Sequence, residues 1–404
     1  MSLKQFYFSF SRQYLRLSSL STKLILLICI FIFIFGFKQI FFNKNSWCNP
    51  EKPLWWFCPW PGQETICSWD EHFPKINQNN RSPEYYEQFL QSLPKRRSSF
   101  VFNNSTLSKC NESSIDLLIF VISKCSHGSI RQSIRRTWAN LHLLHNHYKT
   151  LSIKLLFLVD NDSQSTQKIL LENEYYQDIV QVINLPEQYE FVTQRESALY
   201  EFVIKRCQQT RFVFKTDDDI FINTFLLLSK VQSLNELENE KTKKKSYFLS
   251  GFPIDYGLVI RHTKDSVGQR YIITKDEYFC PRYPRFLSGF GYLMTLETCS
   301  LLFDAYQRDS KPFPLSDVYF SGLLSEMMNI PRLTILENVH YRYESQCNED
   351  FFRLNNKNAL ACAASNDHFH GKQSHGDRSL MNDYNLYWTI LMEQYNVIKN
   401  QHEQ

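Results

Sequence analysis

The sequence predicts an α/β domain built on a mostly parallel central sheet. Continuous apolar runs of strand length recur along it, as in "IDLLIFVIS" (Ile115–Ser123) and "IKLLFLV" (Ile153–Val159). Such runs are typical of strands buried on both faces, which is how parallel sheets are covered. Stretches with helical spacing separate the runs, and that alternation is typical of an α/β domain.

The predicted elements follow one another without an internal repeat. We expect a helix over residues 129–147 ("SIRQSIRRTWANLHLLHNH"), then a polar helical stretch that leads to a strand over 178–184. A helix over 191–207 precedes the strand "RFVFK" at 211–215. The sequence "EKTKKKS" indicates a solvated loop before the strand "YFLSGF", and "DVYFSGLLSEMM" at 317–328 indicates a further helix.

Composition limits the class of protein. The chain has 404 residues, enough for one large domain with additional segments or for two domains. It is 43% hydrophobic and 15% aromatic, so it is able to bury a sizeable core and is not a disordered chain. The net charge is only +4, which gives no reason to expect nucleic acid as a partner.

The N-terminal region predicts a membrane anchor. Residues 24–37 ("LILLICIFIFIFGF") carry no charge, and apolar residues resume after Lys-Gln and continue to Phe42, just long enough for a bilayer span of about 20 residues. We predict a cytosolic tail over 1–23, a signal anchor over 24–42 and a lumenal or extracellular remainder, since basic residues precede the apolar run. The alternative, a cleaved signal peptide, is disfavoured by the long polar N-terminal region and by the lack of a small-residue cleavage site.

Residues 43–112 are predicted to be a stem, and residues 113–404 the folded domain. The segment "WCNPEKPLWWFCPWPGQETICSW" predicts either a small disulfide-stapled knot or an irregular disulfide-tied linker. Ten of the 11 cysteines follow the apolar run, an even number that permits disulfides in an oxidising compartment, and no CxxC pair argues for zinc. Glycosylation sequons, clustered mainly before the domain, indicate an exposed stem: Asn80, Asn103, Asn104, Asn111 and Asn161.

Three consecutive aspartates, Asp217 to Asp219, follow the strand "RFVFK" after a single residue, Thr216. Ligands of open α/β sheets bind at the carboxyl ends of strands, and carboxylate oxygens suit hard cations such as Mg²⁺ and Mn²⁺. A divalent ion would cancel the repulsion between these carboxylates and would bridge the phosphates of a nucleotide. The alternative is an acidic turn or an N-cap for the helix "NTFLLLSKV"; the strand before the triplet and "IFIN" after it favour the metal site.

Four motifs follow one another along the chain: "RQSIRRTW" (Arg131–Trp138), "KTDDDIFIN", "YPRFLSGFGYLMT" (Tyr283–Thr295) and "SDVYFSG" (Ser316–Gly322). In this order they resemble the motifs of the animal Golgi β-1,3-glycosyltransferase family, which holds β-1,3-galactosyltransferases and β-1,3-N-acetylglucosaminyltransferases and is distantly related to Fringe. The resemblance implies a GT-A catalytic domain, a UDP-sugar donor, a Mn²⁺ cofactor and inversion at the sugar carbon. It also implies a type II protein of the Golgi membrane that acts on a glycan acceptor of a glycoprotein or glycolipid.

The resemblance assigns roles to individual residues. Asp317, before Val in "SDVYFSG", corresponds to the base that takes the acceptor proton; as the first residue of a predicted helix it would also serve as an N-cap. Asp219 corresponds to a direct Mn²⁺ ligand, with Asp217 as a further metal contact. Asp217 and Asp218 would contact the nucleotide sugar or support the site.

Further candidates come from helical spacing and from glycines. Arg131, Arg135 and Trp138 fall on one helical face, and we expect that face to bind the nucleotide; an exposed Arg pair beside a core Trp is the alternative. Gly289 and Gly291 would let backbone approach the ligand, although an ordinary turn also explains them. A histidine is expected to complete the metal site, His340 or His370, against the simpler role of a surface or core histidine.

Two departures from the family pattern carry weight. Ser316 stands where the family has an acid, and "NLPEQYEFVTQR" keeps Thr193 and Arg195 but loses the acids of its pattern. We predict an inverting β-1,3-glycosyltransferase that transfers a hexose or N-acetylhexosamine, with galactose favoured. The alternative that these departures support is a catalytically silent relative that acts as a lumenal chaperone or glycan-binding protein.

Overall fold

The computed structural model describes residues 82–106, 110, 114–239, 245–264, 268–342, 347–363 and 377–397. All of them lie in the second of two units, residues 66–404, into which the chain divides. The predicted anchor, most of the predicted stem and the sequons at Asn80 and Asn111 lie outside the described residues. Within the described ranges no helix combines the length and apolarity needed to cross a membrane.

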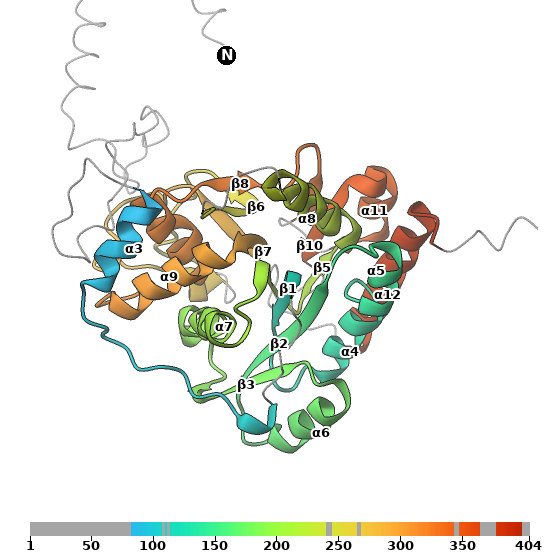
Figure 1. Ribbon diagram of the computed structural model, residues 1–404, viewed down its shortest axis with the longest axis horizontal. Coiled ribbons are helices and arrows are strands. Elements are labelled where there is room, and N and C mark those ends of the chain that lie inside the picture. The colour runs from blue at the N-terminus through green and yellow to red at the C-terminus, as the bar shows by residue number, and fades with distance from the viewer. Residues whose placement is uncertain are drawn as a thin grey trace, which may run out of the picture. The chain divides into compact units, whose positions relative to one another are not determined.

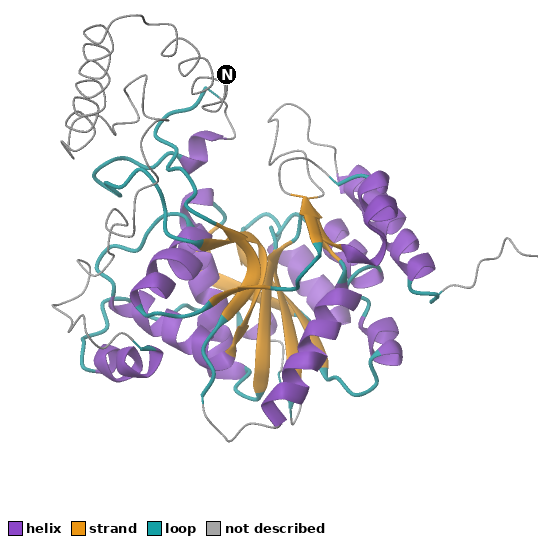
Figure 2. Ribbon diagram, turned by 90° about the horizontal axis from the view of Figure 1, so that it is seen from above, coloured by secondary structure: helices purple, strands orange, loops and turns teal. Residues whose placement is uncertain are grey.

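A mixed sheet of seven strands forms the centre of the domain (Figure 2). Its spatial order is β3 (Ile179–Pro186), β2 (Ile153–Asn161), β1 (Ile115–Ile122), β4 (Thr210–Asp217), β7 (Phe286–Thr295), β6 (Leu249–Ile254) and β8 (Arg332–Thr334). Every neighbouring pair is parallel except the two pairs made by β7, which runs antiparallel to β4 and to β6. The prediction of a mostly parallel sheet is therefore confirmed.

Helices cover both faces of this sheet (Figure 1). One face is packed by α3 (Pro83–Gln91), α7 (Val192–Arg206) and α9 (Leu296–Arg308), and the other by α4 (Gly128–Arg136), α5 (Leu141–His147), α8 (Thr224–Asn239) and α12 (Asp377–Gln394). Strand β1 shows why a continuous apolar run is needed, because Leu118 and Phe120 enter one core while Ile119 and Val121 enter the other. Helix α6 (Thr166–Tyr176) places Ile169 against the ends of β2 and β3.

Two predicted boundaries need correction. The stretch predicted as a single helix over 129–147 is two helices, because the chain turns at Thr137 and Asn140 caps α5 by accepting from the Leu143 N–H at 3.1 Å. The predicted stem also overlaps the domain, since Tyr86 and Leu90 of α3 are fully buried in its core. The domain thus includes residues from 82 onward, not only those after 112.

Smaller elements complete the described part of the domain. A second sheet has the order β5 (Ile220–Ile222), β10 (Ala359–Ala363) and β9 (His340–Arg342). The remaining helical elements are η4 (Asn104–Thr106), η5 (Tyr189–Phe191), η6 (Gly268–Tyr271), η7 (Val318–Leu324), α10 (Ser325–Met327), α11 (Glu349–Asn355) and η8 (Asn356–Asn358). Among them η7 is a π-helix, a form that is frequent at functional sites.

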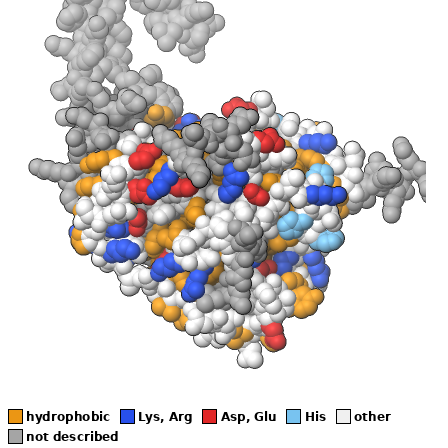
Figure 3. All heavy atoms as spheres, in the orientation of Figure 1, with side chains coloured by type: hydrophobic (Ala, Val, Ile, Leu, Met, Phe, Trp, Pro, Cys, Tyr) orange, Lys and Arg blue, Asp and Glu red, His pale blue; other side chains and the backbone are white. Residues whose placement is uncertain are grey.

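The predicted disulfides are present in the described part of the chain. Cys110 is bonded to Cys207, and Cys347 to Cys362, while Cys125 and Cys299 are buried free thiols. The first bond closes a separation of 97 residues and ties the start of the domain to the end of α7. Figure 3 shows basic and acidic side chains interspersed over the face that it presents, in keeping with the small net charge.

Candidate active site

The candidate site lies where the parallel strands end and β7 begins. Asp217 is the last residue of β4 and is in register with Ile122, the last residue of β1. Because β7 runs in the opposite direction, with Tyr292 opposite Lys215, its first residues reach the same edge. This reversal brings Gly289 beside the aspartate triplet, although about 70 residues of sequence separate them.

Asp317 is held at this edge by two backbone donors. The N–H of Val318 donates to its Oδ1 at 2.8 Å, and the N–H of Gly289 donates to its Oδ2 at 3.1 Å. Burial raises the pKa of Asp317, and these backbone hydrogen bonds and the cation of Lys215 oppose part of that rise. A carboxylate fixed in this way and with a raised pKa is suited to accept a proton, and the predicted N-cap is also present.

The two predicted glycines have different roles. A Cβ on Gly289 would meet Oδ2 of Asp317 at 3.5 Å, so this residue lies directly against the carboxylate. Gly291 has φ of +150°, and a Cβ there would lie 2.8 Å from the Phe214 ring and 2.9 Å from the carbonyl oxygen of Lys215. Gly291 therefore allows β7 to pack closely on β4, whereas Gly289 borders the site.

A buried lysine links the aspartates on β4 to the β7 edge. The Nζ of Lys215, whose side chain is 2% exposed, lies 3.2 Å from Oδ1 of Asp217 and donates to the carbonyl oxygen of Gly289 at 3.3 Å. Nearby acids raise the pKa of Lys215 to about 12 against the opposing effect of burial, so the side chain stays charged. Its ammonium is an internal counter-charge within a cluster of acids.

Desolvation raises the pKa of Asp217 to about 6, and the neighbouring charge of Asp219 adds to the rise while Lys215 lowers it. This happens although 38% of the Asp217 side chain is exposed, because the rest of the carboxylate's surroundings is protein rather than water. The two carboxylates thus repel one another, which is the arrangement that the sequence suggested for a cation site.

Sequence reasoning missed Glu196, which is fully buried beneath the site. Its Oε1 accepts hydrogen bonds from the hydroxyls of Tyr200 and Tyr292, and its Oε2 lies 3.8 Å from Nζ of Lys215. These contacts of Glu196 hold the Lys215 side chain in place. The sequence feature that could have identified Glu196 is an acid within the apolar face of a predicted helix, in "RESALYEF". An unpaired charge there would be unfavourable, so a buried partner was to be expected.

Asp218 is engaged by neighbouring residues of the protein. Its Oδ2 accepts from Ser123 Oγ at 2.6 Å and lies 2.8 Å from Nδ1 of His127, while its backbone oxygen accepts from the Tyr384 hydroxyl at 2.6 Å. Only 6% of Asp218 is exposed. In these contacts Asp218 supports the site from within the protein, and Asp217 and Asp219 remain the metal candidates of the triplet.

The predicted nucleotide-binding helix face requires correction. Arg131 and Trp138 are fully buried, and the Arg131 guanidinium donates to Glu172 at 2.9 and 2.7 Å and to Ser123 Oγ at 3.0 Å. Through Ser123, Arg131 supports the carboxylate of Asp218 rather than presenting its charge to solvent. Arg131 thus lies on the buried face of α4, and Trp138 is buried just after the end of that helix.

Arg135 is also engaged within the protein. Its guanidinium donates to both carboxylate oxygens of Asp178, at 2.7 and 2.8 Å, and to Glu172 at 2.8 Å. It also lies over the rings of Phe157 and Tyr176, with centroid distances of 4.7 and 4.0 Å. Arg135 therefore joins α4 to α6 and β3, and it is not placed to bind a nucleotide in this structure.

The two histidine candidates have different outcomes. His340 is exposed and pairs with Ala359 at the start of β10, whereas Ile220, next to Asp219, pairs with Ala363 at its end. Four strand residues span about 13 Å, so His340 is too distant to share an ion with Asp219. His370 lies outside the described residues. Among those that are described, no three His, Cys, Asp or Glu side chains are grouped as a metal centre.

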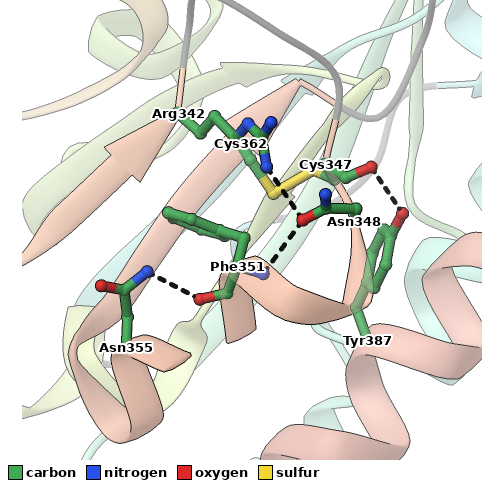
Figure 4. Close-up of a disulfide and its surroundings, with 7 residues drawn as sticks. All are labelled: Arg342, Cys347, Asn348, Phe351, Asn355, Cys362 and Tyr387. Carbon is green, nitrogen blue, oxygen red and sulfur yellow. Dashed lines mark hydrogen bonds between the residues drawn. A yellow bond between two sulfur atoms is a disulfide. The ribbon is translucent and has the colours of Figure 1, made fainter. Parts of the chain in front are cut away.

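The second disulfide, shown with its surroundings in Figure 4, anchors β10, the strand that pairs with β5 just after the triplet. Cys347 binds Cys362 of β10, and Cys362 is in register with Phe221 of β5, two residues after Asp219. Asn348 caps α11 through the Phe351 N–H at 3.0 Å, and the Tyr387 hydroxyl donates to the Cys347 oxygen at 3.0 Å. The disulfide thereby holds the strand whose end lies next to Asp219.

The described sequons differ in exposure. The side-chain amide of Asn103 donates to Gln181 Oε1 at 2.8 Å, whereas Asn104 and Asn161 are exposed. Glycosylation of each remains a prediction, and the exposed pair has the simpler access.

Comparison with known proteins places the chain in a family. The family model described as Galactosyltransferase matches residues 129–335, just over half of the chain. The rat protein named UDP-GalNAc:beta-1,3-N-acetylgalactosaminyltransferase 1 is 28% identical over 256 residues, which are 61% of this chain and 72% of the relative. The mouse protein named Beta-1,3-galactosyltransferase 1 is 26% identical over 240 residues, 59% of this chain and 68% of the relative.

Similarity to solved structures is weaker. A structure described as a glycosyltransferase involved in the glycosylation of the major capsid of PBCV-1 has a TM-score of 0.32 and 9% identity, and covers 67% of this chain and 99% of that one. A score this low carries no argument about the site. The matched range of the family model includes all four motifs, from Arg131–Trp138 to Ser316–Gly322. The chain belongs to the galactosyltransferase family.

Proposed function

We propose that the protein is an inverting β-1,3-glycosyltransferase that moves a hexose or N-acetylhexosamine, with galactose as first choice, from a UDP-sugar to a glycan acceptor. The observation that carries this proposal is the position of Asp317. Its carboxylate is held by Gly289 and Val318 at the strand edge that also bears Asp217 and Asp219. Family membership and the transferase names of the relatives support the same reaction class.

A divalent cation fits the residues that are present. Asp217 and Asp219 supply only carboxylate oxygens, the donors that Mn²⁺ and Mg²⁺ accept. Desolvation raises the pKa of Asp217, and the neighbouring charge of Asp219, which an ion would neutralise, adds to that rise. We propose Mn²⁺ held by these two residues, with His370 as a further candidate ligand. A bound ion would supply electrostatic stabilisation of the diphosphate leaving group.

The residues of the chain itself have separable tasks. Asp317 accepts the proton of the acceptor hydroxyl, and its backbone donors hold the carboxylate in one orientation. Lys215 holds Asp217 and the Gly289 carbonyl, so it orients both the triplet and the strand that borders Asp317. Glu196, with its two tyrosines, fixes Lys215.

The cellular setting is part of the same proposal. We propose a GT-A catalytic domain in the Golgi lumen, anchored as a type II membrane protein by residues 24–42. The apolar N-terminal run, the sequons and the disulfides support it. The acceptor would be carried by a glycoprotein or a glycolipid.

Release of UDP tests the proposal directly. The purified protein would be mixed with each of several UDP-sugars and a panel of glycan acceptors, with Mn²⁺ and then with EDTA. Acceptor-dependent release from one donor that is lost in EDTA is expected. A folded protein that neither releases nor binds UDP would instead support the silent chaperone or glycan-binding role that Ser316 suggests. The Asp317→Asn variant is the matched control, because it removes the base and leaves the triplet intact.

A further inference from the structure

The start of β7 and the π-helix η7 pack closely against each other at the candidate base. Asp317 caps η7, and Gly289 of β7 donates to its carboxylate. A Cβ on Gly322 of η7 would lie only 3.0 Å from Cβ of Phe286, the first residue of β7, so a larger residue there would crowd the two elements. The geometry of the base therefore depends on how these two elements are held together.

The hydroxyl of Ser321 joins these two elements. Its Oγ accepts from the N–H of Leu287 in β7 at 2.8 Å and lies 2.6 Å from the backbone oxygen of Asp317, to which it donates. The backbone oxygen of Leu287 lies farther from this Oγ, at 3.2 Å. A hydroxyl carries a single proton, so we assign that proton to the shorter contact with Asp317. Ser321 is fully buried, and the bridge from Leu287 to Asp317 is therefore shielded from water.

Asp317 is thereby connected to β7 at two points. Its Oδ2 accepts from the Gly289 N–H at 3.1 Å, and its backbone oxygen is linked through Ser321 to Leu287, two residues earlier on the same strand. The first contact holds the carboxylate, and the second holds the backbone from which the carboxylate extends. Without the Ser321 hydroxyl, the buried N–H of Leu287 would lose its acceptor, and the start of η7 would be free to shift along β7.

We propose that Ser321 is a positioning residue, which holds the Asp317 carboxylate in place for proton transfer by fixing the start of η7 to β7. This inference rests on the proposed function, in which Asp317 is the base. A misplacement of about 1 Å is enough to slow a catalysed reaction about 10²-fold, so the bridge bears directly on rate. Ser321 is fully buried and has no surface for either sugar, so its loss should affect turnover rather than substrate binding.

Ser325 provides a matched control in the adjoining turn of the same helical segment. Its hydroxyl is also fully buried and donates to the backbone oxygen of Phe320 at 2.7 Å, a bond that stays within the segment. Ser325→Ala therefore removes one buried hydroxyl contact, as Ser321→Ala does, but leaves the bridge to β7 intact. A difference between the two variants separates the bridge from the general effect of losing a buried hydrogen bond.

Kinetics of the full-length protein test this role. The donor would be the UDP-sugar that wild type transfers, with UDP-galactose tried first, and the acceptor p-nitrophenyl N-acetyl-β-D-glucosaminide. Ser321→Ala is expected to lower kcat about tenfold to 10²-fold, while both KM values stay within about twofold of wild type. Ser325→Ala should leave kcat and both KM values within about twofold of wild type.

The pH profile gives a readout that a loss of stability alone would not move. In Ser321→Ala the hydrogen bond from Gly289 to the Asp317 carboxylate would weaken, and since that bond lowers the pKa of Asp317, the pKa should rise. The charges of Lys215 and Glu196, which also act on Asp317, are unchanged by the substitution. The inflection of kcat/KM on the acid side should therefore move to higher pH in this variant and stay in place in the Ser325 control.

Hydrogen exchange followed by mass spectrometry adds a measurement that needs no activity: the backbone amides of Leu287 and Gly289 should exchange faster in Ser321→Ala than in wild type. Ser321→Cys keeps a similar size with a weakly hydrogen-bonding sulfur, should fall between wild type and Ser321→Ala, and carries the test if the alanine variant does not fold. Equal kinetics in the Ser321 and Ser325 variants, or unchanged exchange at β7, would overturn the role of Ser321 alone. A wild-type protein without transfer from any UDP-sugar would instead remove the proposed function, and the positioning role with it.

Discussion

Replacing Lys215 with Met tests the buried charge network under the site. The substitution keeps a long side chain but removes the cation from between Glu196 and Asp217. Glu196 is fully buried, so its carboxylate would lose its counter-charge within the protein interior, whereas the 38% exposed Asp217 side chain has water to replace its partner. Most of the loss should therefore come from Glu196, about 3 to 5 kcal/mol of unfolding free energy, as for other broken buried pairs.

The double variant Lys215→Met with Glu196→Gln makes the prediction specific. Glutamine still accepts from the two tyrosine hydroxyls but carries no charge, so at least about 2 kcal/mol of the lost stability should return. Urea denaturation of the purified proteins, followed by fluorescence, measures these free energies. Lys245→Met is the matched control, because the 53% exposed Lys245 pairs with Glu87 at the surface and should cost less than about 1 kcal/mol. If Lys215→Met lost as little unfolding free energy as Lys245→Met, or if the double variant recovered none of the loss, the reasoning would be refuted.

Other predictions concern the reaction and the disulfide. Asp317→Asn should lower transfer by at least about 10²-fold while Mn²⁺-dependent UDP binding, measured by calorimetry, stays near wild type; near-normal turnover would remove Asp317 from the base role. Because burial raises the pKa of Asp317, and because only the ionised carboxylate accepts a proton, kcat/KM should fall as pH is lowered, with an inflection above the ordinary value of 3.8; a flat profile down to that pH would contradict this assignment. Asp219→Ala should weaken UDP binding with Mn²⁺ but not without it, and unchanged metal dependence would exclude the cation site. Cys347→Ser should lower the melting temperature through a loss of about 3 kcal/mol, given the 15-residue separation of the bonded cysteines; an unchanged melting curve would show that the disulfide contributes little.

Much of the fold could be predicted because the local pattern of apolar residues shows which strands are buried on both faces. The apolar runs that became β1 and β2 need cover on each side, and only a sheet between two helical layers provides it. The position of the aspartate triplet also followed from local order, since the strand before it ends where ligands bind in such sheets. Asp317 came from a motif, and its N-cap contact is a local feature of the helix that it begins.

Other parts of the site could not be predicted because periodicity does not say what covers a face. Helical spacing placed Arg131, Arg135 and Trp138 together, yet whether that face meets solvent depends on α6 and α12, which pack against it from elsewhere in the chain. The sequence offers His340 as a metal ligand, but the register of β9 on β10 places it at the end of β10 away from Asp219. The spacing of residues along the chain does not show which helices cover this face or how β9 pairs with β10.

By itself, the sequence determined the family, the α/β class, the acidic strand end and the residue expected to act as base, because each depends on neighbouring residues or on motifs. Only the tertiary structure decided the direction of β7, which carries Gly289 to Asp317 and sets Lys215 between Glu196 and Asp217. The hydrogen bond from Gly289 to Asp317 joins residues 28 apart in the sequence, and the contact between Glu196 and Lys215 joins a helix to a strand. They form because a buried charge must find its partner wherever the chain packs, and no short stretch of sequence specifies where that will be.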